Sequence, residues 1–288
     1  MTSPLPEHVG RRCHNVLNPL HSTHYFSPDL GRELAAAGIE DRSAAYFAVR
    51  AAAMGPVGAG VVTATFYNFA PSLVAHMIPR AWTLASPEQV VEARWEVARR
   101  SLTRLLGDEA IESAEFAELA GLLREACDAL TPEGRPLYAG HADLPWPNDP
   151  LLDLWHAATL LREYRGDGHI AALLHADLNG LEALITHTAT GRGFTLPAAK
   201  ATRGWSEEEW AAESAALAER GLLDDDGLTP EGKDLRARIE AETDVLSADP
   251  WLLLGAERTA RVVELGKGFA RKLVAGGAFS AEVFAGGR

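Results

Sequence analysis

The chain has 288 residues, enough for one large or two ordinary domains, and it carries a formal net charge of −13 with 47% hydrophobic residues. The acidic balance works against a nucleic-acid partner, because lysine and arginine supply most of the nonspecific affinity for phosphates. Two cysteines exclude a disulfide framework, and the lack of a long apolar stretch or an apolar signal core predicts a cytoplasmic protein without membrane contact.

The first half of the chain is predicted to be a series of helices. Residues 1–20 look irregular. Ser27 and Pro28 then mark a helix start, since serine caps a helix well and proline suits its first position. Ser86 and Gln89 form a capping box, in which each side chain satisfies a backbone N–H at the helix entry. Helices are expected over residues 27–37, 41–54, 59–67, 71–78, 86–106 and 109–129.

Residues 145–150 are the best linker candidate. They include three prolines, which a helix interior does not accommodate. The linker divides the chain into two predicted units, 1–145 and 146–288. In the second unit, Gly166 and Gly168 are expected to break the first helix. The expected elements of this unit are helices over 149–164, 169–176, 180–188 and 206–220, a hairpin over 221–229, and helices over 229–246 and 254–275.

Each half contains a copy of the same short motif. Leu-Thr-Pro-Glu-Gly-Arg at residues 130–135 recurs as Leu-Thr-Pro-Glu-Gly-Lys at residues 228–233. The segments 68–76 and 179–187 also match, because each begins with asparagine and ends with histidine. Two copies of one small unit usually pack about a pseudo-two-fold axis, and ligand sites often form in the cleft between them.

The second unit has the element order of a winged helix-turn-helix, with a hairpin before its penultimate helix. It contains Leu217-x-x-Arg220-Gly221-Leu222-Leu223, Leu228-Thr229-x-x-Gly232 and Ile239-Glu240-x-x-Thr243-Asp244. These motifs resemble the wing of MarR-type regulators and the helix that follows it.

Longer motifs run through most of the chain. They include His24-Tyr25-Phe26-Ser27-Pro28, Leu154-Trp155-His156-Ala157-Ala158-Thr159-Leu160-Leu161-Arg162-Glu163-x-Arg165-Gly166-Asp167-Gly168-His169 and Arg203-Gly204-Trp205-Ser206. With them the chain resembles the SalK-like family, which implies a tandem winged-helix fold and no settled reaction. We therefore predict a mainly α protein of two pseudo-symmetric winged helix-turn-helix units with small β-hairpin wings. In the first unit the wing is expected to be replaced by the helix over 109–129.

The expected recognition elements have the wrong chemistry for reading DNA. Base edges are contacted mainly by Arg, Lys, Asn, Gln, Ser and Thr side chains. We take residues 180–188 as the recognition helix of the second unit and 70–78 as its counterpart; neither contains Arg or Lys. Three aspartates, Asp224 to Asp226, would place negative charge against phosphate. We therefore expect both helices to pack inside the protein, and we expect no nucleic-acid partner.

The densest group of reactive side chains lies in residues 162–169, at the predicted helix break. Arg162 and Arg165 could hold an anionic group in a bidentate manner. His169 could donate or relay a proton. The alternative is a structural ion-pair network at the joint between the units, and both interpretations stay open.

Other candidates would line a central cavity. Arg50 is expected to face Arg162 across it, with His24 and Tyr25 closing the mouth. Glu182 is the second candidate acid or base, after His169, because a carboxylate in an apolar helix has a raised pKa or a cationic partner. The remaining predicted ligand contacts are Tyr67, Trp155 and His187.

The sequence thus favours a small-molecule-binding protein with its ligand pocket between two degenerate winged-helix units. The ligand would be apolar or aromatic and partly anionic, and the protein would either sense it or transform it without a tightly held organic cofactor. Two alternatives remain: a DNA-binding MarR-like transcriptional regulator, and a haem- or metal-binding protein that uses some of the ten histidines. No metal-ligand set is predicted, the cofactor is left unknown, and a homodimer is compatible with the sequence.

Overall fold

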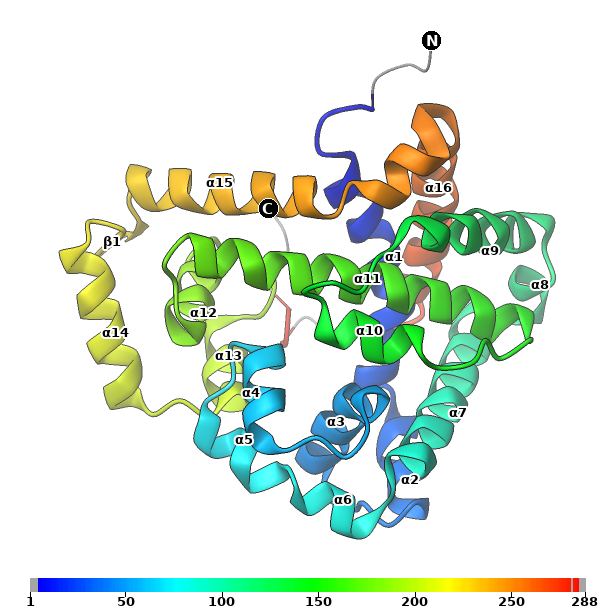
Figure 1. Cartoon of the computed structure of the whole chain (residues 1–288), viewed down its shortest axis with the longest axis horizontal. Coiled ribbons are helices and arrows are strands. Elements are labelled where there is room, and N and C mark those ends of the chain that lie inside the picture. The colour runs from blue at the N-terminus through cyan, green and yellow to red at the C-terminus, as the bar shows by residue number, and fades with distance from the viewer. Residues whose placement is uncertain (1–4, 281, 285–288) are drawn as a thin grey trace.

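The computed structural model describes residues 5–280 and 282–284, and its regular structure is almost entirely helical (Figure 1). The first half contains α1 (Val9–Phe26), α2 (Pro28–Ala36), α3 (Arg42–Ala51), η1 (Ala52–Met54), α4 (Ala59–Phe66), α5 (Pro71–Met77), α6 (Arg80–Leu84), α7 (Pro87–Leu106), α8 (Asp108–Ile111), α9 (Ala114–Ala126), η2 (Cys127–Ala129) and α10 (Pro136–Ala142). The second half contains α11 (Pro150–His175), α12 (Gly180–Thr188), α13 (Leu196–Arg203), α14 (Glu207–Glu219), β1 (Leu223–Asp224), β2 (Gly227–Leu228), α15 (Pro230–Leu246) and α16 (Asp249–Ala275). Among the described helices none is alone long and apolar enough to cross a membrane, and only the pair 42–54 and 59–66, bent by 94°, meets that requirement together.

Helix starts follow the capping residues of the sequence. Ser27, Ser86 and Ser206 each accept a hydrogen bond from a backbone N–H two or three residues further on. Gln89 and Glu209 complete capping boxes with the latter two serines. Each such cap stabilises a helix by about 1 kcal/mol. The helix starts predicted from these residues are confirmed.

One hydrophobic core extends through both halves of the chain. It joins α1, α7 and α9 to α11 and α16, with Leu20, Leu102 and Leu154 among its buried members. Smaller core clusters lie within each half. α11 runs through the middle of the molecule (Figure 1) and is buried around most of its circumference, as expected of a helix covered on all sides. The predicted boundary at 145–150 therefore falls between segments that share a core.

α11 is continuous, which corrects the predicted break at Gly166 and Gly168. Each glycine inside a helix costs about 1 kcal/mol relative to alanine, and the burial of this helix offsets that cost. Gly168 is where α11 meets other elements closely. A Cβ atom there would lie 2.9 Å from Arg135 Nη1 and 3.3 Å from Leu246 Cβ. The glycine therefore serves close packing and not chain termination.

α1 corrects the expectation that residues 1–20 are irregular; residues 1–4 lie outside the described part of the chain. The helix begins at Val9 and packs on α16 so closely that a Cβ atom on Gly266 would lie 2.8 Å from Val16 Cγ2. Its buried face includes polar residues, among them His21 and Thr23. Burial of polar side chains hides the apolar periodicity by which a helix is recognised in sequence.

Besides α1, three further helices, α6, α10 and α13, were not predicted. The start of α10 shows why local sequence is insufficient. Its N-terminal residue Arg135 offers no side-chain cap. Instead the carboxylate of Asp167, on α11, accepts hydrogen bonds from the backbone N–H groups of Leu137 at 3.1 Å and Tyr138 at 2.9 Å. A cap supplied from a distant helix leaves no signal next to the helix that it stabilises.

α13 and α14 form a helix-turn-helix motif followed by a wing. The turn between them runs from Gly204 to Ser206, and Gly204 has φ 76°, a conformation that favours glycine. The wing is the antiparallel pair β1 and β2, in register Leu223 to Leu228, and α15 follows it. The predicted hairpin over 221–229 is confirmed. In the first half, the regular elements between α7 and α10 are α8, α9 and η2, with no strand assigned among these described residues.

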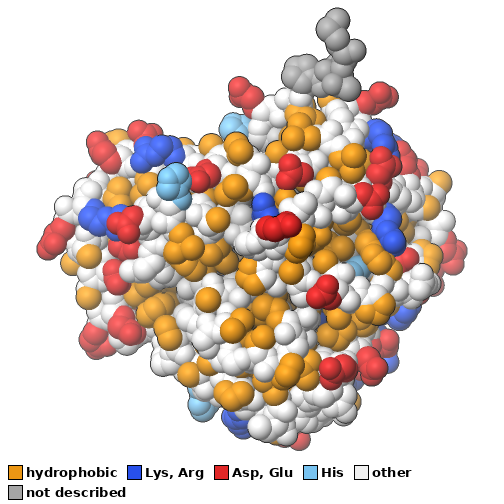
Figure 2. All heavy atoms as spheres, in the orientation of Figure 1, with side chains coloured by type: hydrophobic (Ala, Val, Ile, Leu, Met, Phe, Trp, Pro, Cys, Tyr) orange, Lys and Arg blue, Asp and Glu red, His pale blue; other side chains and the backbone are white. Residues whose placement is uncertain are grey.

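α14 is the helix next to the wing, which corrects the choice of residues 180–188 as the recognition helix. Those residues form α12, whose segment from Leu181 to Thr186 is buried. α5, which was expected to be packed inside, leaves His76 exposed. α14 contains no Arg or Lys, and acidic side chains gather along the edge of the molecule that carries α14 and β1 (Figure 2). The exposed acids of α14 are Glu207, Glu208, Glu209 and Glu219.

Candidate functional site: a buried arginine cluster

Three arginines from three helices surround the side chain of Tyr25, which lies on α1. Arg50 comes from α3, Arg94 from α7 and Arg162 from α11; we call them the central arginine cluster. Burial raises the pKa of the Tyr25 hydroxyl, the charge of Glu163 adds to this, and the three guanidinium groups oppose it. The Tyr25 hydroxyl is buried and makes no hydrogen bond of normal geometry with the described residues, although the Arg94 guanidinium lies close enough for a weak one.

Arg94 is the most deeply buried member of the cluster, with 1% of its surface exposed. Its guanidinium carbon lies 4.4 Å from the centroid of the Trp155 ring, and its Nη1 lies 3.5 Å from Nδ1 of His141. Its Nε and Nη2 atoms have no hydrogen-bond partner among the described residues. The N–H donors of a buried guanidinium are normally hydrogen-bonded. Arg94 can therefore still donate hydrogen bonds to an added acceptor.

Glu163 is the carboxylate whose charge acts on all three arginines within the described part of the chain. It is 2% exposed and accepts a hydrogen bond from Arg162. One carboxylate cannot neutralise three guanidinium groups. Burial of uncompensated charge is costly, which favours the binding of an anion at this position.

The Tyr46 hydroxyl lies in the positive potential of the cluster, which lowers its pKa. Arg50 Nη1 donates to its hydroxyl at 3.4 Å, and the Arg50 guanidinium carbon lies 3.9 Å from the Phe66 ring centroid. Burial by itself would raise the pKa of the Tyr46 hydroxyl, but the charges of Arg50, Arg203 and Arg162 outweigh it and lower the pKa. Several guanidinium groups therefore act on one phenol from different helices.

Neutral histidines surround the cluster. Burial, followed by nearby arginine charges, holds the pKa values of His21, His24 and His141 well below the usual value of histidine. His156 is also fully buried, and burial lowers its pKa to about 3. His21 Nδ1 lies 2.9 Å from the hydroxyl of Thr159. These rings supply neutral donors and acceptors, and they add no charge to the site at neutral pH.

Arg165, one turn along α11 from Arg162, belongs to a different group of side chains. It donates to Asp244 at 2.9 Å, to Ser247 at 3.0 Å and to Glu240 at 3.2 Å, all on or just after α15. The alternative interpretation was an ion-pair network among Arg162, Glu163, Arg165 and Asp167; the observed network shares only Arg165 with it, while Arg162 pairs with Glu163. The observed network links α11 to α15, whereas Arg162 faces the central cluster.

The remaining predicted site residues lie elsewhere. His169 is in the middle of α11, and its Nδ1 lies 2.8 Å from the Thr243 hydroxyl. Glu182 completes the capping box of α12 by accepting from the Asn179 N–H at 2.8 Å, and it also accepts from Arg220. The assignment of His169 and Glu182 as acid or base stays a prediction. In the structure both side chains make contacts between helices.

Tyr67 and His187 are also outside the central arginine cluster. The Tyr67 hydroxyl donates to the carbonyl of Leu178, joining α4 to the turn before α12. His187 lies against Gly193, and burial lowers its pKa to about 4. Five of the predicted residues do surround the cluster or belong to it: His24, Tyr25, Arg50, Trp155 and Arg162.

Two members of the site, Arg94 and His141, were missed by sequence reasoning. A signal for Arg94 exists. Its position in α7 is on the same helical face as Val90, Val97 and Ser101, all of which are buried. An arginine on the apolar face of an amphipathic helix is unusual and could have been noticed. His141 lies in α10, whose existence itself was not predicted.

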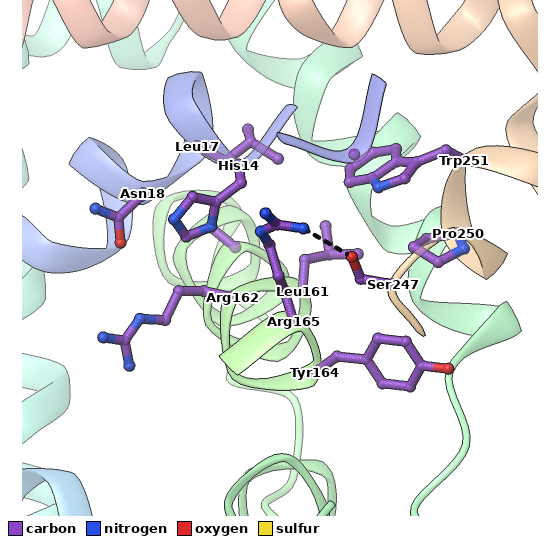
Figure 3. A pocket seen from close by; sticks show the side chains of 12 residues that line it. His14, Leu17, Asn18, Leu161, Arg162, Tyr164, Arg165, Ser247, Pro250 and Trp251 are labelled. Atoms are coloured by element: carbon purple, nitrogen blue, oxygen red, sulfur yellow. Dashed lines mark hydrogen bonds between the residues drawn. The ribbon is translucent and has the colours of Figure 1, made fainter. Parts of the chain in front are cut away.

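A small hollow lies beside the cluster, between α1, α11 and the segment that joins α15 to α16. It is lined by His14, Arg162, Arg165 and Trp251 among others, and Arg162 and Arg165 point away from each other there (Figure 3). Its volume of about 10 Å³ matches roughly one water molecule. The side chain of Arg162 is 25% exposed, which makes it a more exposed member of the cluster than Arg94.

The described residues contain no group of three or more His, Cys, Asp or Glu side chains that could hold a metal ion. No curated protein and no solved structure shows a significant match to the chain. A sequence profile described as a helix-turn-helix family matches residues 10–280, which include the α13–α14 motif, its wing and all three arginines of the cluster. The chain therefore belongs to this helix-turn-helix family.

Proposed function

We propose that the protein binds a small anionic molecule at the central arginine cluster. The observation that carries the proposal is the charge imbalance: of the three arginines, only Arg162 forms an ion pair with a carboxylate of the described residues, that of Glu163. Arg94 and Arg50 also keep buried nitrogens without hydrogen-bond partners among the described residues. An anionic group would compensate the charge and accept the unused donors at the same time.

The surroundings of the cluster favour a ligand with an aromatic or apolar part. Tyr46, Phe66 and Trp155 pack around the guanidinium groups. Aromatic side chains beside a few convergent polar groups are typical of small-molecule sites. The cluster draws its arginines from α3, α7 and α11, and it is therefore built by the first predicted unit, 1–145, together with the second, 146–288.

Contacts between the two predicted units support a pseudo-symmetric arrangement. The aligned segments 68–76 and 179–187 come together at their starts, because Tyr67 donates to Leu178 and a Cβ atom on Gly180 would lie 3.5 Å from the Cα of Asn68. In a pseudo-two-fold assembly, equivalent segments meet near the axis. The proposed ligand site would then lie between the units, as the repeat in the sequence predicts.

A thermal-stability panel tests the proposal. Phosphate, sulfate and benzoate are added to the wild-type protein at constant ionic strength, with benzyl alcohol as the neutral control. An anion bound at a hundred times its Kd stabilises the folded state by about 2.7 kcal/mol. We expect at least one anion to raise the Tm, and we expect Arg94→Met and Arg50→Met to lose that increase. Arg271→Met, which removes an exposed arginine of α16, should retain it.

Two results would contradict the proposal. One is a wild-type protein that none of the three anions stabilises more than benzyl alcohol does. The other is stabilisation that persists undiminished in both Arg94→Met and Arg50→Met, which would assign the effect to surface charge.

DNA binding is the second candidate function, and the α13–α14 motif with its wing is the observation in its favour. The electrostatics oppose it, because the exposed face of α14 carries four glutamates and the wing carries Asp224 to Asp226. A gel shift with random duplex at low salt decides the question, since nonspecific affinity is strongest there. We expect no shift; a shift that salt abolishes would favour the regulator instead.

A further inference from the structure

Arg203 connects the helix-turn-helix motif to the interior. It is the last residue of α13, and it is 7% exposed. Its guanidinium carbon lies 4.5 Å from the ring centroids of both Phe69 and Phe194. Nη1 donates to the Thr202 hydroxyl at 2.6 Å, while Nε is buried without a partner among the described residues. The side chain thus extends away from solvent and keeps an unused donor.

Arg203 lies next to the central arginine cluster. The Phe69 ring, on which it stacks, is 5.9 Å from the Tyr46 ring, and Tyr46 accepts a hydrogen bond from Arg50. Among the described residues, Arg203 hydrogen-bonds the Thr202 hydroxyl and has no carboxylate partner; burial lowers its pKa, and the Arg50 charge nearby lowers it further. Arg203 therefore increases the uncompensated positive charge of the interior.

The backbone of the helix-turn-helix motif also contacts the first half of the chain, at the residues on either side of Phe69. The N–H of Ala70 donates to the carbonyl of Arg203 at 2.9 Å, and Trp205 Nε1 donates to the carbonyl of Asn68 at 3.1 Å. A Cβ atom on Gly204 would lie 2.7 Å from Leu73 Cβ. The turn of the motif therefore rests on the segment between α4 and α5, while Arg203 reaches beneath it.

We propose that the anion at the central cluster is also bound by Arg203 and thereby fastens the helix-turn-helix motif to the first half of the protein. This inference rests on the proposed function. Without the anion, the buried charge of Arg203 opposes docking; with it, the same charge favours docking. A ligand shifts a conformational equilibrium only through its differential affinity for the two states. Arg203 would supply that difference, because it touches the ligand only while the motif is docked.

Hydrogen exchange of the full chain, with and without phosphate, sulfate or benzoate, tests the inference. In the wild type we expect the anion that stabilises the protein to slow exchange in residues 196–228, which contain α13, α14 and the wing. Arg203→Met should weaken that anion about tenfold, the typical effect of losing a charged hydrogen bond. At saturating anion the variant should show no added protection of residues 196–228. Arg271→Met, which removes an exposed arginine of α16 outside the segment, should behave like the wild type.

Failure of this inference can be told apart from failure of the proposed function. If an anion stabilises the wild type through Arg50 and Arg94 but leaves exchange in residues 196–228 unchanged, the role of Arg203 is refuted and the site stands. Equal protection of that segment in Arg203→Met and wild type refutes it as well. If no anion binds the wild type, the proposed function has failed. Should Arg203→Met not fold, as circular dichroism would show, the exchange of the wild type alone decides.

Discussion

Replacing Arg94 by methionine should stabilise the protein in the absence of an anion. Arg94 gains from its position over Trp155, from a long contact with His141, and from the nearby Tyr25 hydroxyl and Glu163 carboxylate. A desolvated cation–π contact contributes about 2 kcal/mol, and a marginal hydrogen bond contributes roughly 0.5–1 kcal/mol. Against these stands the penalty of burying a charge, which is several kcal/mol per ion. Because Arg94 is 1% exposed and Arg162 adds repulsion, we expect a net gain of about 1–3 kcal/mol for Arg94→Met.

The measurement is the free energy of unfolding from chemical denaturation in a buffer without phosphate or sulfate, with the Tm as a second readout. A gain of 1 kcal/mol raises the Tm of a chain of this size by roughly 2–4 °C. Arg165→Met is the matched control, since it removes an arginine from α11 whose donors are filled by Asp244, Ser247 and Glu240. This variant should destabilise the protein by about 1–3 kcal/mol. The loss is smaller than for a fully buried ion pair, because Asp244 keeps Arg11 as a partner and Glu240 is partly exposed.

Addition of a binding anion should reverse the order of wild type and Arg94→Met. The reasoning is refuted if Arg94→Met destabilises the protein as strongly as Arg165→Met does. That result would mean that the cluster is a structural element whose charges are already compensated in the folded state.

Two further predictions concern packing and pH. Gly168→Ala should destabilise by about 1–3 kcal/mol, because Arg135, near which the new Cβ would lie, is held by the carbonyls of Tyr164 and Leu246. Gly166→Ala meets ordinary contacts and should stabilise by up to about 1 kcal/mol; equal effects in urea unfolding would contradict this account. The pKa of His156 is about 3 in the folded protein and near 6.5 in the unfolded chain. Its contribution is therefore fully present above pH 6.5 and is lost as pH falls toward 3, at about 1.4 kcal/mol per pH unit. His156→Phe should flatten the pH dependence of unfolding by one proton, and an unchanged slope would show that the ring is already protonated in the folded state.

Local sequence was sufficient for the elements whose determinants lie within a few residues. The caps at Ser86 and Ser206 depend on backbone groups three residues away, and the hairpin at 221–229 depends on its own turn. Such interactions exist in almost any tertiary context, so the pattern that predicts them is also their cause. The mainly helical class and the wing follow from these elements, whereas α13 of the helix-turn-helix motif was not predicted.

Only the tertiary structure decided which charges are compensated. Arg162 and Arg165 are three residues apart on one helix, and no sequence feature distinguishes them. Arg165 donates to Asp244 on α15, whereas Arg162 pairs with the adjacent Glu163 and adds its charge to those of Arg50 and Arg94. Which partner a long side chain meets depends on how helices pack, because contacts between segments that are far apart in the chain form only when the whole core closes. For the same reason the continuity of α11 through its glycines, and the site itself, appear only in the folded molecule.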